Sequence, residues 1–315
     1  MKSFRTMVVA VFLLLPVFFA GAAGSGEEMQ EQKGPVTVAS KIDTEGALLG
    51  SMIVQLLEAE GFEVDDSTEF GPTDVIRKAI TNDEIDIYPE YTGNGAFFYP
   101  DAASPDAWKD AEEGFETIQR LDMENHSIVW LEPSPANNTW AISVRRDFAE
   151  SEGLESLDDL ASYLEDNDEF KLAASEEFVT RPDTLPAFEE AYGFDLSSDQ
   201  LLTFSGGNTA TTTQAAARET DGVNAAMAYG TDGNLSALDL KVLEDSRNVQ
   251  PYYRPAPIVR QAVLDEYPEI ESVLEPVFSS LDLETLQSLN ARIAVQGEDA
   301  AQVARDYLTE NGFLE

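Results

Sequence analysis

The feature that most constrains the fold is a repeated change between strand-like and helix-like hydrophobic spacing. In the first part of the chain, short apolar runs alternate with segments in which apolar residues recur at helical intervals. This pattern predicts strands at 36–40, 62–66 and 85–89, with helices at 48–57 and 72–80 between them. We expect Thr73 and Asp74 to cap the second helix. Such alternation is typical of α/β units around a largely parallel sheet.

A second series of the same kind begins after the stretch "NNTWAISVRRD" (137–147). It predicts a capped helix at 156–164, a strand at 171–175, a helix at 184–194 ending near Gly193, a helix at 211–219 and a strand at 222–230. Consecutive helices then follow at 268–281, 283–293 and 298–313. Two α/β sets and a helical tail indicate two lobes, with the tail packed on the first. Because no flexible spacer separates the lobes, we expect a hinge and a cleft between them.

The N-terminal residues have the pattern of a secretory signal. Lys2 and Arg5 precede an apolar run at 7–20, and Ala20 and Ala22 supply small residues for cleavage. The run is short for a membrane span, although an uncleaved anchor is the alternative. The chain has no Cys, which excludes disulfides and a lipidated cysteine. We therefore expect cleavage after a signal peptide at 1–24 and a periplasmic mature protein.

The charge of the chain is strongly negative. There are 60 Asp and Glu against 19 Lys and Arg, a formal net charge of −41. A field of this sign disfavours nucleic acid and anionic lipid as partners. The acids are distributed along the chain, which indicates a surface adapted to high salt, where self-repulsion is screened. A calcium site is disfavoured because no stretch has the spacing of a calcium-binding loop.

Sequence signals for catalysis are weak. The single His, His126, is expected at the surface beside a strand, and no Ser lies in a G-x-S-x-G turn. Without Cys and with one His, thiol catalysis and His-rich metal sites are excluded. The glycine-containing loop at 205–213 lacks the Lys of a phosphate loop and is interpreted as a helix-capping loop. We expect no metal and no cofactor. An exported hydrolase using two of the many carboxylates stays open as an alternative.

Aromatic residues stand at the ends of several predicted strands. Tyr88 and Tyr91 follow the run 85–87 on an expected turn that Pro89 and Gly93 stiffen. The others at or near strand ends are Trp140, Tyr229, Tyr252 and Tyr253. Each alone is better explained by core or rim packing, and Tyr88 and Glu90 are assigned no ligand role. Because α/β proteins bind ligands at strand ends facing a crevice, the set as a whole predicts an aromatic cage.

Six separated motifs, in order and spacing, resemble the osmoprotectant-binding family of ABC-transporter substrate-binding proteins. They are "ASKIDTEGALLG", "NDEIDIYPEYTGNG", "NNTWAISVRRD", "FVTRPDTLPAFEEAYGF", "AYGTDGNLSALDLKVLED" and "PAPIVRQAVLDEYPEIESVL". The family takes glycine betaine, choline and related quaternary amines. The resemblance implies a periplasmic-binding-protein fold, two α/β lobes that close over a ligand, without catalysis. We expect the first lobe at 34–139 and 245–315 and the second at 140–244.

The resemblance also implies a set of ligand-binding residues. Matched motif by motif, the family's positions fall on Lys41, Tyr91, Asn94, Asn138, Trp140, Arg181, Tyr229 and Tyr253. Three positions depart from the family pattern. Asn94 replaces a Thr, Trp140 replaces a Tyr, and Gly46 stands where some relatives have a Gln.

The chemistry of a trimethylammonium group fits these residues. The group has no N–H to donate, so aromatic faces recognise it better than hydrogen-bond acceptors do. We expect Lys41 and Arg181 to hold the carboxylate of a betaine by charge-assisted hydrogen bonds. The sequence thus predicts a monomeric receptor that delivers a betaine to an ABC permease. A choline receptor and a sensory module that presents its ligand to a signalling receptor remain as alternatives.

Overall fold

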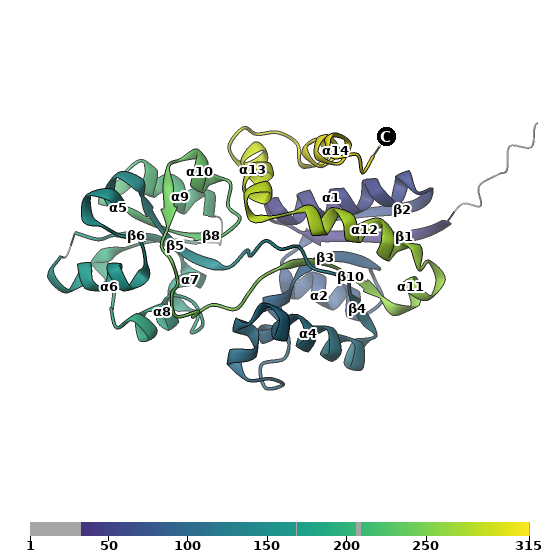
Figure 1. Ribbon diagram of the computed structural model, residues 1–315, viewed down its shortest axis with the longest axis horizontal. Coiled ribbons are helices and arrows are strands. Elements are labelled where there is room, and N and C mark those ends of the chain that lie inside the picture. The colour runs from purple at the N-terminus through teal and green to yellow at the C-terminus, as the bar shows by residue number, and fades with distance from the viewer. Residues whose placement is uncertain (1–32, 168, 206–208, 315) are drawn as a thin grey trace, which may run out of the picture. The chain divides into compact units, whose positions relative to one another are not determined.

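The computed structural model describes residues 33–167, 169–205 and 209–314. The predicted signal peptide at 1–24 lies outside the described residues, as do residues 206–208 of the loop predicted at 205–213. Within the described residues the chain forms two five-stranded sheets flanked by helices (Figure 1). The predicted α/β class is therefore confirmed.

The first sheet has the strand order β2-β1-β3-β10-β4. β1 pairs in parallel with β2 and β3, whereas β10 pairs antiparallel with both β3 and β4. The sheet is therefore mixed, and β10 runs opposite to the other four strands. The strands are β1 (Lys33–Lys41), β2 (Phe62–Gly71), β3 (Ile87–Tyr91), β4 (Ile128–Trp130) and β10 (Pro255–Arg260).

The second sheet repeats this plan with the order β7-β6-β8-β5-β9. β6 pairs in parallel with β7 and β8, and β5 pairs antiparallel with β8 and β9. In each sheet the reversed strand is the one the chain enters after crossing from the other sheet. The strands are β5 (Trp140–Arg145), β6 (Leu172–Ser175), β7 (Leu201–Phe204), β8 (Ala225–Tyr229) and β9 (Leu240–Val242).

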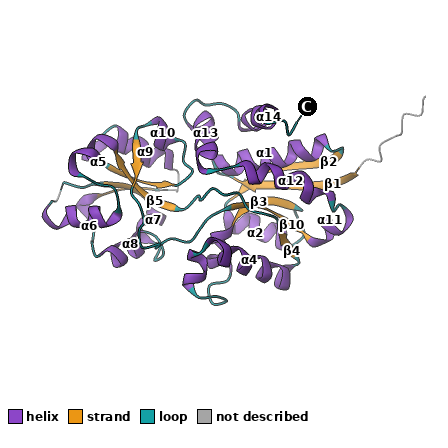
Figure 2. Cartoon of the chain, in the orientation of Figure 1, coloured by secondary structure: helices purple, strands orange, loops and turns teal. Residues whose placement is uncertain are grey.

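Helices cover both faces of each sheet (Figure 2). Those flanking the first sheet are α1 (Thr44–Ala59), α2 (Thr73–Thr81), α3 (Gly95–Phe98), α4 (Ala111–His126), α11 (Gln261–Glu266), α12 (Glu269–Ser280), α13 (Leu283–Ala294) and α14 (Ala300–Glu310). Those flanking the second are α5 (Arg146–Glu152), α6 (Leu157–Asp166), α7 (Glu176–Thr180), α8 (Leu185–Tyr192), α9 (Thr209–Ala217) and α10 (Asn234–Ala237). Among the described helices, none has the length and apolar content that a bilayer span requires.

Local sequence signals explain many helix ends. The Asp43 carboxylate accepts a hydrogen bond from the Gly46 amide and so starts α1. Ser156 and Asp159 form a capping box at α6, and Gly193 ends α8 in the left-handed conformation, as predicted. The prediction that Thr73 and Asp74 cap α2 was wrong. Pro72 occupies the N-cap, and no side chain accepts from that helix start.

Alternation along the strands builds a core on each side of each sheet. On one face of the first sheet, Val38 and Ile87 pack with α1, α12 and α14. On the other face, Ala39 and Tyr88 pack with α2 and α4. The second sheet likewise has a bulky core beneath α5 to α8 and an alanine-rich core beneath α9 and α10.

The C-terminal helices were predicted to pack on the first lobe. They do so, and one of them also contacts the second sheet. α14 packs on α1, but α13 contacts both α1 and α10, which belongs to the second sheet. The Gln287 amide donates to the Gly230 carbonyl at 2.8 Å. Contact is close at Gly233, where an added Cβ would lie 2.1 Å from the Ala291 amide nitrogen. The chain crosses between the two sheets in two segments, 131–139 and 243–254. α13 is thus a third connection between the sheets, besides these two crossing segments.

We expect Gly233→Ala to lower the free energy of unfolding by about 1–3 kcal/mol, because the new methyl group forces α13 away from α10. Urea denaturation measures the change. Gly114→Ala is the matched control, since its Cβ would meet nothing closer than the Ala107 carbonyl oxygen at 3.3 Å. In a helix this exchange changes stability by no more than about 1 kcal/mol. Equal losses in both variants would contradict the close packing at Gly233.

Candidate functional site

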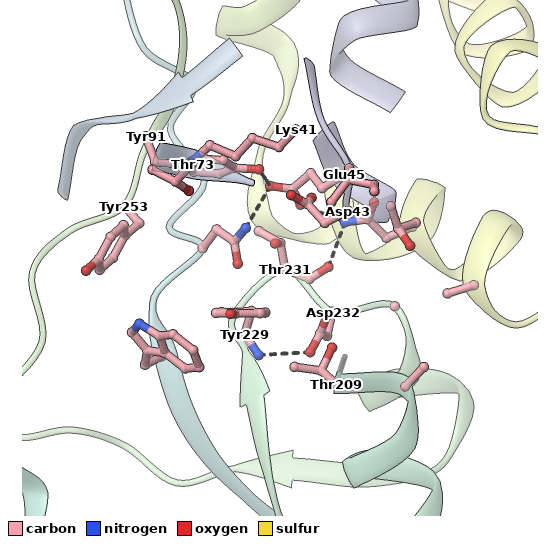
Figure 3. Close-up of a pocket in the computed structure, with 18 of the residues that line it drawn as sticks. Lys41, Asp43, Glu45, Thr73, Tyr91, Thr209, Tyr229, Thr231, Asp232 and Tyr253 are labelled. Carbon is pink, nitrogen blue, oxygen red and sulfur yellow. Dashed lines mark hydrogen bonds between the residues drawn. The ribbon is translucent and has the colours of Figure 1, made fainter. Parts of the chain in front are cut away.

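A cavity of about 520 Å³ lies among residues from both sheets. All eight residues that the sequence predicts for the site line it: Lys41, Tyr91, Asn94, Asn138, Trp140, Arg181, Tyr229 and Tyr253. Figure 3 shows several of them converging from different strands. The structure therefore brings the predicted set together, although it does not by itself test their role in binding.

Strand register places the aromatic residues. Trp140 opens β5 directly opposite Tyr229, the last residue of β8, and the two ring centroids are 4.6 Å apart at an interplanar angle of 48°. In the first sheet, Pro255 of β10 pairs with Tyr91, the last residue of β3. This register brings Tyr253, two residues before Pro255, beside the end of β3. Gly93 permits this approach, because a Cβ there would lie 2.8 Å from the Tyr253 ring.

The predicted turn at Tyr88 and Tyr91 was wrong, because both residues belong to β3 and the turn begins at Thr92. Period-two alternation sends the Tyr88 ring into the core beneath α2 and α4, where its hydroxyl donates to Glu90 at 3.0 Å. Tyr91 is instead part of the cavity lining. A strand backbone, rather than a stiff turn, fixes the Tyr91 ring.

Trp140 is buried, although a residue at a strand end beside a crevice could have been an exposed rim residue. Its side chain is 6% exposed and packs in the core of the second sheet, with the Phe178 ring at a centroid distance of 5.5 Å. Since one part of the indole packs inward and another lines the cavity, its removal affects folding as well as the site.

Lys41 is already paired within the protein. Its ammonium donates to the Glu90 carboxylate, and both side chains are buried. The same carboxylate accepts from the Tyr91 amide at 2.7 Å and from the Asn94 side-chain amide at 2.7 Å. The Lys41 ammonium also stands over the Tyr91 ring, 4.6 Å from its centroid. Asn94 therefore keeps a hydrogen-bonding function at the position where the family pattern has Thr.

Arg181 is similarly engaged. It donates to the Asp183 carboxylate through two nitrogens, at 2.6 and 2.7 Å, and to Glu177 at 2.8 Å. These hydrogen bonds, those to Asp183 above all, raise its pKa. Its guanidinium carbon lies 5.8 Å from the Trp140 ring centroid. The two cations assigned to a ligand carboxylate therefore have protein partners, which the sequence analysis did not foresee.

Glu45 is a site residue that sequence reasoning missed. It lies in the first turn of α1, is 5% exposed and lines the cavity. Its carboxylate accepts from the Tyr91 hydroxyl at 2.8 Å, from Asn138 at 3.0 Å and from Asn290 at 2.7 Å. Burial raises the pKa of Glu45 to about 7, against the effect of these donors. The sequence signal was its place two residues after the helix cap Asp43, in a motif otherwise noted for Lys41.

The cavity lining carries more acids than bases. Asp43, Glu45, Glu177 and Asp232 line it, against Lys41 and Arg181. Asp232 accepts from the Tyr229 amide at 2.8 Å, and burial raises the pKa of Asp232 to about 6. A cavity of this composition favours a positive group over an anion.

The close packing of Lys41 against α1 explains why glycine stands at position 46. A Cβ at this position would lie 2.7 Å from the Lys41 carbonyl oxygen and 3.0 Å from the Lys41 Cβ. The side chain that some relatives carry here would therefore require the backbone at Lys41 to shift. The tight approach helps to hold Lys41 against the start of α1.

The described residues of this site include neither a cluster of metal ligands nor a histidine. Among the described residues, no group of three or more His, Cys, Asp or Glu is arranged to hold a metal ion. His126 ends α4, two residues before β4, and is exposed as expected; it is not part of the cavity lining. The arrangement provides aromatic faces, amides and carboxylates around a cavity.

Comparisons with known proteins agree with this arrangement. Residues 34–310 match the model of the substrate-binding domain of ABC-type glycine betaine transport systems. The chain is 58% identical over 279 residues to the glycine betaine-binding protein YehZ of Escherichia coli K12, covering 89% of this chain and 91% of that protein. The apo structure of YehZ superposes with a TM-score of 0.76 at 57% identity, covering 89% and 99% of the two chains. A glycine betaine/carnitine/choline ABC transporter structure gives a TM-score of 0.77 at 21% identity, covering 89% and 100%. The predicted periplasmic-binding-protein fold is confirmed.

We expect Lys41→Met to lower the free energy of unfolding by about 3–5 kcal/mol, because the variant leaves the buried Glu90 carboxylate without its cation. The double variant Lys41→Met/Glu90→Gln removes the charge as well and is expected to recover most of this loss. Chemical denaturation of the wild type and the two variants measures the difference. A single variant as stable as the wild type would show that the pair does not support the site.

Proposed function

Because this chain belongs to the family of substrate-binding domains of ABC-type glycine betaine transport systems, we propose that it captures a quaternary ammonium osmoprotectant and delivers it to a membrane permease. Glycine betaine, named for the E. coli relative, is the ligand we propose first. The observation that carries the proposal is the convergence of Tyr91, Trp140, Tyr229 and Tyr253 on one cavity. The family is one of transport substrate-binding domains, and we propose no catalytic activity.

The aromatic rings alone supply too little binding free energy for micromolar affinity, so other contacts must contribute. A cation over an aromatic face gains about 0.5–2 kcal/mol, most where water is excluded. Four faces would supply roughly 2–8 kcal/mol, whereas micromolar affinity requires about 8.2 kcal/mol. Because immobilising the ligand also costs free energy, the cage needs the polar groups around it.

We propose that Lys41 and Arg181, with the amides of Asn94 and Asn138, provide contacts for a betaine carboxylate. Lys41 has three N–H donors and Arg181 has five, so their bonds to protein carboxylates leave donors available for a ligand. Closure of the lobes would strengthen these contacts by excluding water.

Choline is a second candidate, and the pairing of the two cations favours it. Lys41 and Arg181 are neutralised by Glu90, Glu177 and Asp183, and the cavity lining has a surplus of acids. A ligand with a net positive charge is attracted to such a cavity, and it needs no cation for a carboxylate.

The wider assignment is also part of the proposal. We propose lobes at 34–139 with 245–315 and at 140–244, export through a signal peptide at 1–24, and a monomeric periplasmic protein. The distribution of strands supports the lobe boundaries, since each sheet draws its strands from one of these sets. The acid-rich composition supports a protein that functions at high salt concentration, where cells need osmoprotectant uptake.

Titration calorimetry in molar salt tests the function. We expect heats of binding with glycine betaine, proline betaine or choline, and none with ectoine, which lacks a quaternary nitrogen. Saturable binding of ectoine with no heat from the three quaternary amines would contradict the proposal.

Trp140→Ala is expected to weaken binding by more than tenfold, because it removes the largest ring face of the proposed cage. Since Trp140 is buried, the variant is also expected to unfold at a lower temperature. Trp140→Phe keeps a ring and is the matched control, with a smaller loss of affinity. Calorimetry at a temperature where both variants are folded separates the effects, and unchanged affinity in Trp140→Ala would remove this residue from the cage.

Arg181→Ala is expected to weaken glycine betaine binding far more than choline binding, because choline has no carboxylate to pair with a guanidinium. The ratio of the two dissociation constants, measured in wild type and variant, reports this difference. Glu177→Gln leaves the guanidinium in place and serves as control. Equal losses for both ligands would show that Arg181 acts through its contacts with Asp183 and Trp140 alone.

A further inference from the structure

Glu45 connects elements that belong to different parts of the fold, an observation that goes beyond the proposed cage. Its Oε1 atom accepts from the hydroxyl of Tyr91, at the end of β3, and from Asn138, in the segment that crosses to the second sheet. Its Oε2 atom accepts from Asn290 on α13. The Thr231 side chain, in the turn after β8, also hydrogen-bonds to it. One buried carboxylate therefore forms hydrogen bonds to the Tyr91 side chain, to the crossing segment, to α13 and to the turn after β8. Figure 3 shows Glu45, Tyr91 and Thr231 around the cavity.

These partners suit the ionised form of Glu45. The phenol hydroxyl and the two amide nitrogens all act as donors to it. The amide nitrogens cannot accept a hydrogen bond from a protonated carboxyl group, so a hydroxyl would have to turn to accept one. This contact orients the Asn138 amide, whose Oδ1 atom is buried without a hydrogen-bond partner. The Asn290 amide nitrogen donates both to Glu45 and to the Thr231 carbonyl, at 3.0 Å. Protonation of Glu45 would remove the negative charge from its hydrogen bonds to Asn138, Asn290 and Tyr91 and so weaken the hold on the Tyr91 ring.

The charges around Glu45 oppose one another. Asp43 at the start of α1 disfavours its ionisation. Asp232 after β8 lines the same cavity, and the Lys41 ammonium on β1 is already paired with Glu90. Burial dominates and raises the pKa of Glu45 to about 7, so both forms are populated near neutral pH in the empty site. A positive charge entering the cavity favours the ionised form.

We propose that Glu45 is a positioning residue whose deprotonation accompanies ligand capture. This inference rests on the proposed function, since it requires a ligand with a positive head group. Ionised Glu45 fixes the ring of Tyr91 and the amides of Asn138 and Asn290, and the head group in turn stabilises the ionised carboxylate. By thermodynamic linkage, binding releases a proton near neutral pH, and affinity rises as pH rises through the pKa of the empty site.

Calorimetry in buffers with different ionisation enthalpies tests the coupling, with glycine betaine and choline as probes. Near pH 7 we expect roughly half a proton to be released per ligand bound, falling toward zero at pH 8.5. The dissociation constant is expected to fall on the order of fivefold between pH 6 and pH 8. Binding heats that are independent of the buffer at every pH would overturn the inference while leaving the proposed function intact. No binding of either probe would overturn the proposed function itself.

Two variants identify the carboxyl group that releases the proton when ligand binds. Glu45→Gln cannot ionise and is expected to abolish both the release and the pH dependence, whereas a purely structural role would lower affinity equally at every pH. Asp232→Asn removes the other lining carboxylate with a raised pKa and is expected to keep the release near pH 7. Loss of the release in Asp232→Asn would assign the proton to Asp232 and overturn the inference, even if Glu45→Gln fails to fold.

Discussion

Each sheet contains one strand that runs against its neighbours, and the site depends on these two strands. β3 and β8 end at Tyr91 and Tyr229. Because β10 and β5 run the other way, their first residues lie beside those ends, so Tyr253 reaches Tyr91 and Trp140 reaches Tyr229. Ligands of α/β proteins bind at the carboxyl ends of parallel strands. The reversed strands double the number of aromatic residues available at that edge.

Two buried carboxylates then fix the polar groups around the rings. Glu90 accepts hydrogen bonds from the Lys41 ammonium, the Tyr88 hydroxyl and the Asn94 amide. Glu45 accepts hydrogen bonds from the Tyr91 hydroxyl and from the amides of Asn138 and Asn290. A buried charge is tolerated when donors surround it, and the donors are held in return. The site is thereby organised before a ligand arrives, which lowers the ordering cost of binding.

Much of this arrangement could be predicted from the sequence, because the signals are local. Hydrophobic spacing predicted the residue ranges of five of the ten strands and eight of the fourteen α-helices that the described residues form. Strand-end position drew attention to six aromatic residues, and the family resemblance narrowed them to Tyr91, Trp140, Tyr229 and Tyr253. The strand β7 and the helix α4 are among the elements that were not predicted. β7 is four residues long with no buried position, and α4 is largely polar apart from a narrow apolar stripe.

The errors concern interactions between distant residues. Glu90 follows Lys41 by 49 positions and Asn290 follows Glu45 by 245, so no local pattern reports either pair. The burial of Trp140 depends on Phe178 and Tyr229 from other elements, which its own neighbours do not reveal. Pro72 took the N-cap expected for Thr73, a shift of one residue that local propensity rarely resolves.

The role of α13 changes what opening of the cleft requires. A hinge made of two crossing segments alone would let the lobes rotate by backbone torsions in those segments. Here α13 also contacts the second sheet, through Gln287 to Gly230 and Asn290 to Thr231. Opening must therefore break these hydrogen bonds or rotate about them. Because Asn290 also donates to Glu45, a motion that moves α13 away from Thr231 disturbs the carboxylate that holds the Tyr91 ring. Any movement of the proposed lobes would therefore disturb the geometry of the proposed cage through α13.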